Sequence, residues 1–169
     1  MSETNTISPP SATTAPRRAT FYGVFYREVS GRNQVAIPKV MKRAIDDAHE
    51  DQLLLMRWQN EPNLRLYTKN EFDTKLEQVK RKPTLSEEQK STAIALLARS
   101  CEPIEPDSQG RFVLPGRWID ALNIRGEVAF CASHTHIEIW PAEQYREAEK
   151  GEQGKLSPVS AEVTSVLNP

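Results

Sequence analysis

The nine residues from Asp107 to Pro115 contain the side-chain pair with the clearest chemical potential in this sequence. Asp107 and Arg111 flank a turn with Gly110 at its tip, and a short apolar strand that ends at proline follows. A carboxylate at this spacing accepts hydrogen bonds from turn amides. We expect the guanidinium to point away from the hairpin, where it can bind carboxylate or phosphate groups. Such a turn on its own is more often structural than functional.

A weaker copy of this stretch lies upstream, from Ser30 to Pro38. It has the same order of a polar turn, a short apolar strand and a proline. Three pairs of landmarks share a near-constant offset, which is 77 positions for Pro38 and Pro115 and 73 positions for Tyr67 with Trp140 and for Phe72 with Tyr145. A repeated offset of this kind indicates an internal duplication.

The elements around each turn follow the same order. In the first unit the patterns predict strands at 21–29, 34–37, 52–58 and 64–67 and helices at 39–48 and from 69 onwards. A capping box at 68–71 begins the second of these helices. In the second unit they predict strands at 100–106, 111–114, 127–132 and 137–140, with helices that begin at Pro115 and Pro141. A cap at 86–89 begins a more apolar helix, which we expect to pack between the units.

These patterns divide the chain into five segments. We expect a disordered tail at 1–20, since it has few large apolar residues to offset the entropy of ordering. The first repeat then spans 21–83, a connecting helix 84–99 and the second repeat 100–150. A flexible C-terminal tail at 151–169 completes the division.

Composition indicates an ordinary soluble protein. Of 169 residues 38% are apolar and 27% are charged, and the net charge is −1. No apolar run approaches the roughly 20 residues that span a bilayer, and the N-terminus does not have the pattern of a signal peptide. We therefore expect a cytoplasmic protein. Cys101 and Cys131 have no CxxC spacing, so we expect both to be reduced and inert.

Charge is distributed unevenly along the chain. Residues 1–43 contain seven basic and two acidic residues, a net +5, whereas the remainder contains 15 basic and 21 acidic residues, a net −6. A solvated basic tail with a charged helix would explain this count. If the first part instead folds onto one face, that face is cationic.

In its duplicated unit the sequence resembles the MraZ family. The members of this family are bacterial transcriptional regulators with two tandem swapped-hairpin units related to AbrB. The resemblance covers about residues 21–150. Its most specific part is the Asp-x-x-x-Arg signature, met here by Asp107 and Arg111. Supporting parts are Phe21-x-Gly23, Val35-Ala-Ile-Pro38, Leu64-Arg-Leu-Tyr67, Leu96-Leu-Ala-Arg99 and Ile137-Glu-Ile-Trp140.

The resemblance implies an α+β fold of two swapped-hairpin units related by a pseudo-twofold axis. It further implies a ring-shaped homo-oligomer that binds repeated promoter boxes on double-stranded DNA. Those boxes lie upstream of the division and cell-wall gene cluster, which such regulators typically repress. The implied location is the nucleoid, and signature arginines of neighbouring protomers would meet DNA along one rim.

The first repeat departs from the signature. Ser30 and Gln34 occupy the aspartate and arginine positions, and Asn33 occupies the position of the turn glycine. Asparagine tolerates the left-handed conformation, whereas glutamine loses the charge and pairs better with adenine than with guanine. Arg32, Arg27 and the Arg17-Arg18 pair can supply phosphate contacts, which add affinity without sequence information.

The candidate DNA-binding residues are therefore drawn from both turns and the strand before the first. They are Arg111, Asp107, Gln109, Gly110, Arg32, Gln34, Arg27 and Asn33. We predict no enzymatic activity, no cofactor and no metal, because no nucleophile and base are linked and Cys131, His134 and His136 have no evident fourth ligand. Two alternatives remain: an oligomeric scaffold of the same fold that has lost DNA recognition, and an AbrB-type antitoxin.

Overall fold

The computed structural model describes residues 17–155 and 160–167. The predicted N-terminal tail at 1–20 therefore lies mostly outside the described residues. Its last part is packed against the domain, since Ala19 is buried in the main core and the guanidinium of Arg18 lies 3.9 Å from the carboxylate of Glu71.

The first repeat has the predicted order of elements. The structure contains β1 (Val24–Glu28), β2 (Gln34–Ala36), α1 (Lys39–Asp47), β3 (Leu53–Met56), β4 (Leu64–Thr68) and α2 (Lys69–Lys80). Alternation places Leu53 and Leu55 on one face of β3 and leaves Leu54 on the other. Each predicted element of this repeat is thus confirmed, with bounds that differ by a few residues.

The second repeat follows the same order. The connecting helix before it is α3 (Glu87–Arg99). The repeat itself consists of β5 (Cys101–Ile104), β6 (Arg111–Val113), α4 (Gly116–Leu122), β7 (Glu127–Ala132), β8 (Ile137–Pro141) and α5 (Ala142–Lys155), and α6 (Ser160–Leu167) follows it. The last two helices include much of the segment at 151–169 that we expected to be a tail. The predicted boundary at residue 150 thus falls inside α5.

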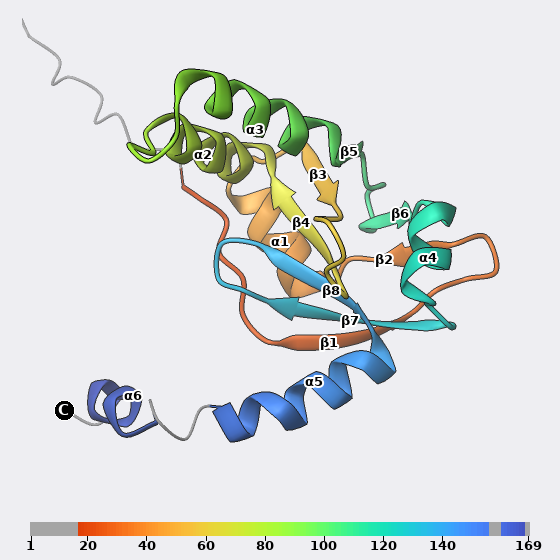
Figure 1. The fold of residues 1–169 in the computed structure, drawn as a ribbon. Coiled ribbons are helices and arrows are strands. Elements are labelled where there is room, and N and C mark those ends of the chain that lie inside the picture. The colour runs from red at the N-terminus through yellow and green to blue at the C-terminus, as the bar shows by residue number, and fades with distance from the viewer. Residues whose placement is uncertain (1–16, 156–159, 168–169) are drawn as a thin grey trace, which may run out of the picture.

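The strands exchange between repeats. Within residues 17–155, six strands form one sheet in the order β1-β7-β8-β4-β3-β5, while β2 and β6 pair separately. The first strand of each repeat therefore pairs with the third strand of the other, as β1 does with β7 and β5 with β3. Figure 1 shows β1 beside β7 although about 100 residues separate them in the chain. This exchange is the swapped-hairpin arrangement that the resemblance implies.

The registers locate a pseudo-twofold axis. In the β2–β6 pair Val35 lies opposite Phe112, which is its own equivalent at an offset of 77. In the β4–β8 pair Arg65 lies opposite Glu138, its equivalent at an offset of 73. Equivalent residues face each other only on such an axis, so the axis passes through both pairs.

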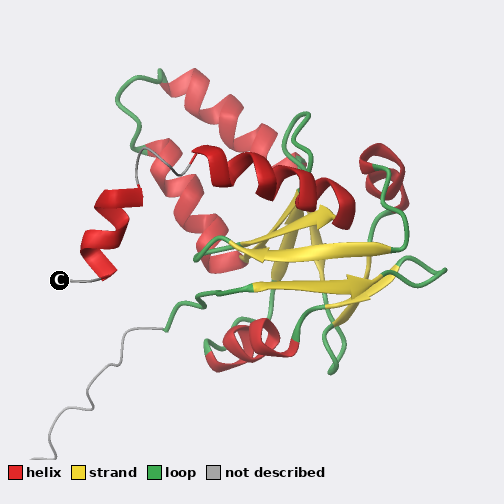
Figure 2. Cartoon of the chain, turned by 90° about the horizontal axis from the view of Figure 1, so that it is seen from below, coloured by secondary structure: helices red, strands yellow, loops and turns green. Residues whose placement is uncertain are grey.

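The six-stranded sheet has helices on both faces, which makes the fold α+β. On one face, α1 and α4 bury Met41 and Trp118 against the main core, in which Phe130 and Leu55 are fully covered. The opposite face carries α2 and α3 at one end and α5 at the other. Figure 2 shows α1 on one side of the sheet and α2, α3 and α5 on the other. No described helix is long and apolar enough to cross a membrane.

Two details of the helices differ from expectation. The reciprocal capping box forms at Ser86 and Gln89, whereas at Thr68 the hydroxyl accepts from the Glu71 amide while the Glu71 side chain pairs with Lys75. Helix α3 does not pack between the units. It contacts α2 and β5 from outside, and none of its residues is buried.

Candidate nucleic-acid interface

Asp107 closes the second turn with its backbone and one carboxylate oxygen. Its Oδ1 accepts hydrogen bonds from the amides of Gln109 and Arg111, both at 2.9 Å. Its carbonyl accepts from the Gly110 amide and its own amide donates to the Arg111 carbonyl, also at 2.9 Å. Gly110 has φ +78°, a conformation in which L side chains are strained. The sequence thus places glycine where the turn requires it.

The Arg111 guanidinium does not point away from the hairpin as we expected. Its Nε donates to the second oxygen of Asp107, Oδ2, at 2.7 Å. The backbone amides of the turn bond only to Oδ1 of Asp107, so Oδ2 is available to the Arg111 side chain. Two hydrogen bonds from Arg111 hold the pKa of Asp107 below its usual range. The bond from the backbone amide has the larger effect, and the bond from the guanidinium has the smaller one. Arg111 keeps 48% of its side chain exposed, and its two Nη groups have no partner among the described residues.

The first turn has the same geometry without the ion pair. The Ser30 hydroxyl accepts from the amides of Arg32 at 3.3 Å and Gln34 at 3.1 Å. The Asn33 amide donates to the Ser30 carbonyl at 2.9 Å, and Asn33 has φ +61°. The predicted tolerance of asparagine is confirmed. The departures from the signature have therefore preserved the shape of the turn and removed the two signature charges.

Each turn is bonded to the strand of the other repeat. The Ile37 amide donates to the Gly110 carbonyl at 2.9 Å, and the Leu114 amide donates to the Asn33 carbonyl at 2.8 Å. The turns precede antiparallel strands, β2 and β6, so they lie at opposite ends of this small sheet. The protomer therefore has two edges, and we call the one with Arg111 the Arg111 edge and the one with Gln34 the Gln34 edge.

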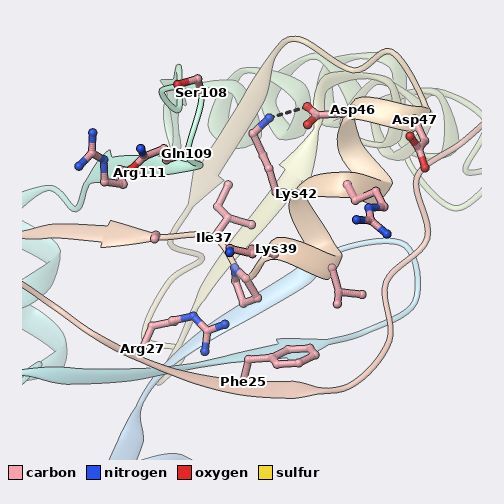
Figure 3. A pocket seen from close by; sticks show the side chains of 14 residues that line it. Phe25, Arg27, Ile37, Lys39, Lys42, Asp46, Asp47, Ser108, Gln109 and Arg111 are labelled. Carbon is pink, nitrogen blue, oxygen red and sulfur yellow. Dashed lines mark hydrogen bonds and ion pairs between the residues drawn. The ribbon is translucent and has the colours of Figure 1, made fainter.

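Helix α1 of the first repeat lies directly against the turn of the second. A methyl group placed on Gly110 would lie 3.4 Å from the Ile37 carbonyl oxygen and 3.6 Å from Lys42 Cδ. The open groove between them has a volume of about 880 Å³. Five cationic residues line it, together with Asp46 and Asp47: Arg27, Lys39, Lys42, Arg43 and Arg111. Figure 3 shows Arg111 and Gln109 on one wall of this groove and Lys39 and Lys42 on the other.

These cations differ in how far they are neutralised. Lys42 forms an ion pair with Asp46 within the helix. Arg27 lies 5.8 Å above the ring of Phe25 and donates to a backbone carbonyl. Lys39 and Arg43 are exposed, and neither has a carboxylate partner in the part of the chain that the structure describes. The groove thus combines a net positive charge with cations that are available to a ligand.

The structure divides the predicted site residues into two groups. Asp107, Gln109, Gly110, Arg111 and Arg27 lie together at the Arg111 edge. Arg32, Asn33 and Gln34 form the turn at the opposite edge. Arg17 and Arg18 lie near the far end of α1, outside the groove.

Sequence reasoning missed the contribution of α1 to the groove. Lys39, Lys42 and Arg43 counted only toward the basic charge of residues 1–43. A signal was present, because Lys39 and Arg43 are four positions apart and share a helix face away from buried Met41 and Ile45. Recognising their position beside Gly110 also required knowledge of the strand exchange.

The residues considered for other chemistry have structural contacts. His136 stacks on Tyr67 at 5.0 Å between ring centroids, and His134 meets Tyr22 edge on. No group of three or more His, Cys, Asp or Glu side chains within the described residues is placed to hold a metal ion. Neither Cys101 nor Cys131 forms a disulfide. Burial raises the pKa of the Cys101 thiol to about 11, so it stays protonated at neutral pH.

Comparison with known proteins identifies relatives over most of the chain. A 25% identical protein from Bacteroides thetaiotaomicron matches over 138 residues, 82% of this chain and 85% of its own length, and is named transcriptional regulator MraZ. Proteins of the same name from Hydrogenovibrio crunogenus and Mycoplasmopsis pulmonis are 25% and 24% identical. They cover 74% and 73% of this chain and 82% and 80% of their own lengths.

The MraZ protein family model, which is also described as antitoxin-like, matches residues 97–163. This range contains the turn with the intact Asp107 and Arg111 pair, and it excludes the turn in which Ser30 and Gln34 replace them. The match over residues 97–163 and the relatives at 24–25% identity show that this chain is similar to proteins of the MraZ family.

Proposed function

We propose that this chain is a transcriptional regulator that binds double-stranded DNA through the Arg111 edge. The observation that supports this function best is the cationic groove at the one turn that keeps the aspartate and arginine pair. A net positive surface attracts the phosphate backbone irrespective of sequence. The relatives named transcriptional regulators favour DNA as the partner of that surface.

Arg111 is the residue most suited to reading a base or clamping a phosphate. Its bond to Asp107 through Nε fixes the guanidinium plane and leaves the Nη groups for a ligand. A guanidinium held in this way can donate two parallel hydrogen bonds to guanine O6 and N7 or to a phosphate. Fixing the side chain before binding lowers the entropy that binding costs.

A homo-oligomeric ring would let weak contacts of single protomers combine. The resemblance to the family implies repeated DNA boxes upstream of the division and cell-wall cluster, and repression of that cluster on the nucleoid in the cytoplasm. Each further protomer that reaches its box then binds at a high effective concentration. Exposed apolar side chains suit contacts between copies, including Leu96 on α3 and Val166 and Leu167 on α6.

Binding to the DNA upstream of this protein's own coding region tests the proposal. We would titrate the purified protein onto that duplex, and onto a shuffled duplex of equal length, at two salt concentrations. Arg111→Ala should weaken binding and reduce the preference for the natural duplex. Arg81→Ala removes the same charge from the exposed end of α2, and it should bind like the parent. Salt-insensitive binding, or equal binding by Arg111→Ala and the parent, would contradict the proposal.

Two other functions have one observation each in their favour. The loss of both signature charges at Ser30 and Gln34 favours an oligomeric scaffold without DNA recognition. It would assemble normally and show no preference between the two duplexes. The antitoxin-like description of the family favours a toxin partner. In that case a second protein encoded beside this one should co-purify with it at a fixed ratio.

A further inference from the structure

We infer that each protomer holds DNA at the Arg111 edge alone, where α1 of the first repeat supplies phosphate contacts beside the Arg111 turn of the second. This inference rests on the proposed function and adds to it. It assigns phosphate contacts to Lys39 and Arg43 and excludes the Gln34 edge from the interface.

The strand exchange creates this composite surface. Gly110 accepts a hydrogen bond from Ile37 at the end of β2, and α1 begins two residues later at Lys39. The side chain of Lys42 lies over Gly110, close enough that an added methyl group would meet its Cδ at 3.6 Å. The Arg111 turn and α1 are therefore neighbours in every folded protomer, and neither repeat contains the surface alone.

The orientation of α1 directs its free cations outward. Met41 and Ile45 are buried at 0% and 2% exposure and fix which face of the helix meets the core. Lys39 and Arg43 lie one helical turn apart on the exposed side. Because they have no carboxylate partner among the described residues, phosphate contact would not require an existing ion pair to break.

The Gln34 edge is the equivalent surface on the other side of the pseudo-twofold axis, and the charges of Lys39, Arg43 and Arg111 are absent there. At an offset of 77, Gly116 occupies the position of Lys39 and Asp120 that of Arg43. Gln34 occupies the position of Arg111. Arg117 is present there, but it pairs with Glu102 at 2.7 Å and lies 4.8 Å above the ring of Trp118.

The turn and the helix of the Gln34 edge therefore carry fewer cations than those of the Arg111 edge. The equivalents of the residues lining the Arg111 groove include two basic residues, Arg32 and Arg117, and two acidic ones, Glu102 and Asp120. The Arg111 groove has five basic residues and two acidic ones. The phosphate backbone carries a high density of negative charge. It is therefore attracted to the Arg111 edge, where the groove lining has a net charge of +3 and the adjacent Asp107 leaves +2, and not to the neutral lining of the Gln34 edge.

Two double variants test the inference. Lys39→Gln with Arg43→Gln removes two charges from the Arg111 edge, and Arg32→Gln with Arg117→Gln removes two from the Gln34 edge. All four residues are exposed, so both variants should unfold near the temperature of the parent. We would measure affinity as a function of salt for each protein, on the duplex from upstream of its own coding region and on the shuffled duplex.

The Lys39 and Arg43 variant should bind both duplexes more weakly, and the slope of log K against log salt should fall by about 2, one for each phosphate contact. The Arg32 and Arg117 variant should keep the parent's affinity and slope. Equal losses in the two variants, or a loss confined to the Arg32 and Arg117 variant, would overturn the inference. If Arg111→Ala loses binding while the Lys39 and Arg43 variant does not, the proposed function stands and this inference fails. A parent that binds neither duplex overturns both.

Discussion

Ser30 and Asp107 close their turns in the same way, although one side chain is neutral and the other is charged. In both turns one side-chain oxygen accepts hydrogen bonds from the backbone amides two and four positions later, and these bonds are sufficient to close the turn. The second oxygen of Asp107 adds the bond to Arg111. At the residue scale, the shape of the turn and its charge are therefore separate properties, and the first repeat kept only the shape.

Gly110→Ala tests how strongly the turn constrains its tip. A side chain at φ +78° costs roughly 1–2 kcal/mol, and the new methyl would lie 3.4 Å from the Ile37 carbonyl oxygen. We expect the free energy of unfolding, measured by urea denaturation, to fall by about 1–2 kcal/mol. The control is Gly31→Ala in the other turn, where no atom lies within 4 Å of the added methyl. Equal stability of Gly110→Ala and the parent would show that the turn can adopt another conformation.

At the element scale, sequence patterns predicted the type of each element, because helix and strand depend mainly on neighbouring residues. The continuous apolar run in β3 and the apolar spacing in α1 indicated strand and helix correctly. The position of α3 was not predictable in this way. Its run of alanine and leucine suggested burial between the units, but it packs against α2 and β5 with Leu96 51% exposed. Composition indicates that a helix has an apolar face, and it does not indicate whether that face meets this chain or another.

The cap of α3 provides a test of how independent this helix is. The Ser86 hydroxyl accepts a hydrogen bond from the backbone amide of Gln89 at 3.2 Å, and the side-chain oxygen of Gln89 accepts one from the backbone amide of Ser86 at 2.9 Å. Ser86→Ala should destabilise the helix by about 1 kcal/mol. Because no residue of α3 is buried, we expect this helix to open without the rest of the domain.

Hydrogen exchange measures this effect directly. In Ser86→Ala the α3 amides should exchange roughly five times faster, while the amides of β7 and β8 stay unchanged. Ser91→Ala, at an exposed position inside the same helix, should leave exchange equal or slower, since alanine is the better helix former. Faster exchange throughout the sheet would mean that α3 unfolds together with the domain.

At the scale of the whole molecule, the duplication was readable from the sequence and the partners of the strands were not. The offsets of 77 and 73 relate equivalent residues, but a duplicated chain can form two separate units or exchange strands between them. The resemblance to the family implied the exchange. The groove depends on that exchange, since Gly110 and Lys42 belong to different repeats and meet only because β2 pairs with β6.

The residue pairs on the pseudo-twofold axis suggest why each repeat pairs with the other repeat and not with a second copy of itself. Arg65 lies directly opposite Glu138 in the β4–β8 pair. Two first repeats joined about the same axis would bring Arg65 against Arg65, and two second repeats would bring Glu138 against Glu138. Like charges directly opposite each other in a sheet are destabilising, whereas opposite charges contribute roughly 0.2–1 kcal/mol. The charge difference therefore favours mixed pairing.

Separate fragments test this preference and, with it, the proposed division into repeats. We would produce residues 17–99 and 100–155 as two chains. In the intact protein β1 pairs with β7 and β5 with β3, so each fragment alone lacks the partner of its first strand. We expect each to show weak or no cooperative unfolding alone. An equimolar mixture should unfold cooperatively, as the intact chain does.

Charge reversal then tests the contribution of the Arg65 and Glu138 pair separately from the rest of the interface. Glu138→Arg in the second fragment should weaken its binding to the first, because it places two cations opposite each other in the sheet. Adding Arg65→Glu to the first fragment restores opposite charges and should recover binding. A stable homodimer of either unmodified fragment would contradict the argument from Arg65 and Glu138. Failure of the second change to restore binding would mean that packing around Val35 and Phe112 selects the partner, with little contribution from charge.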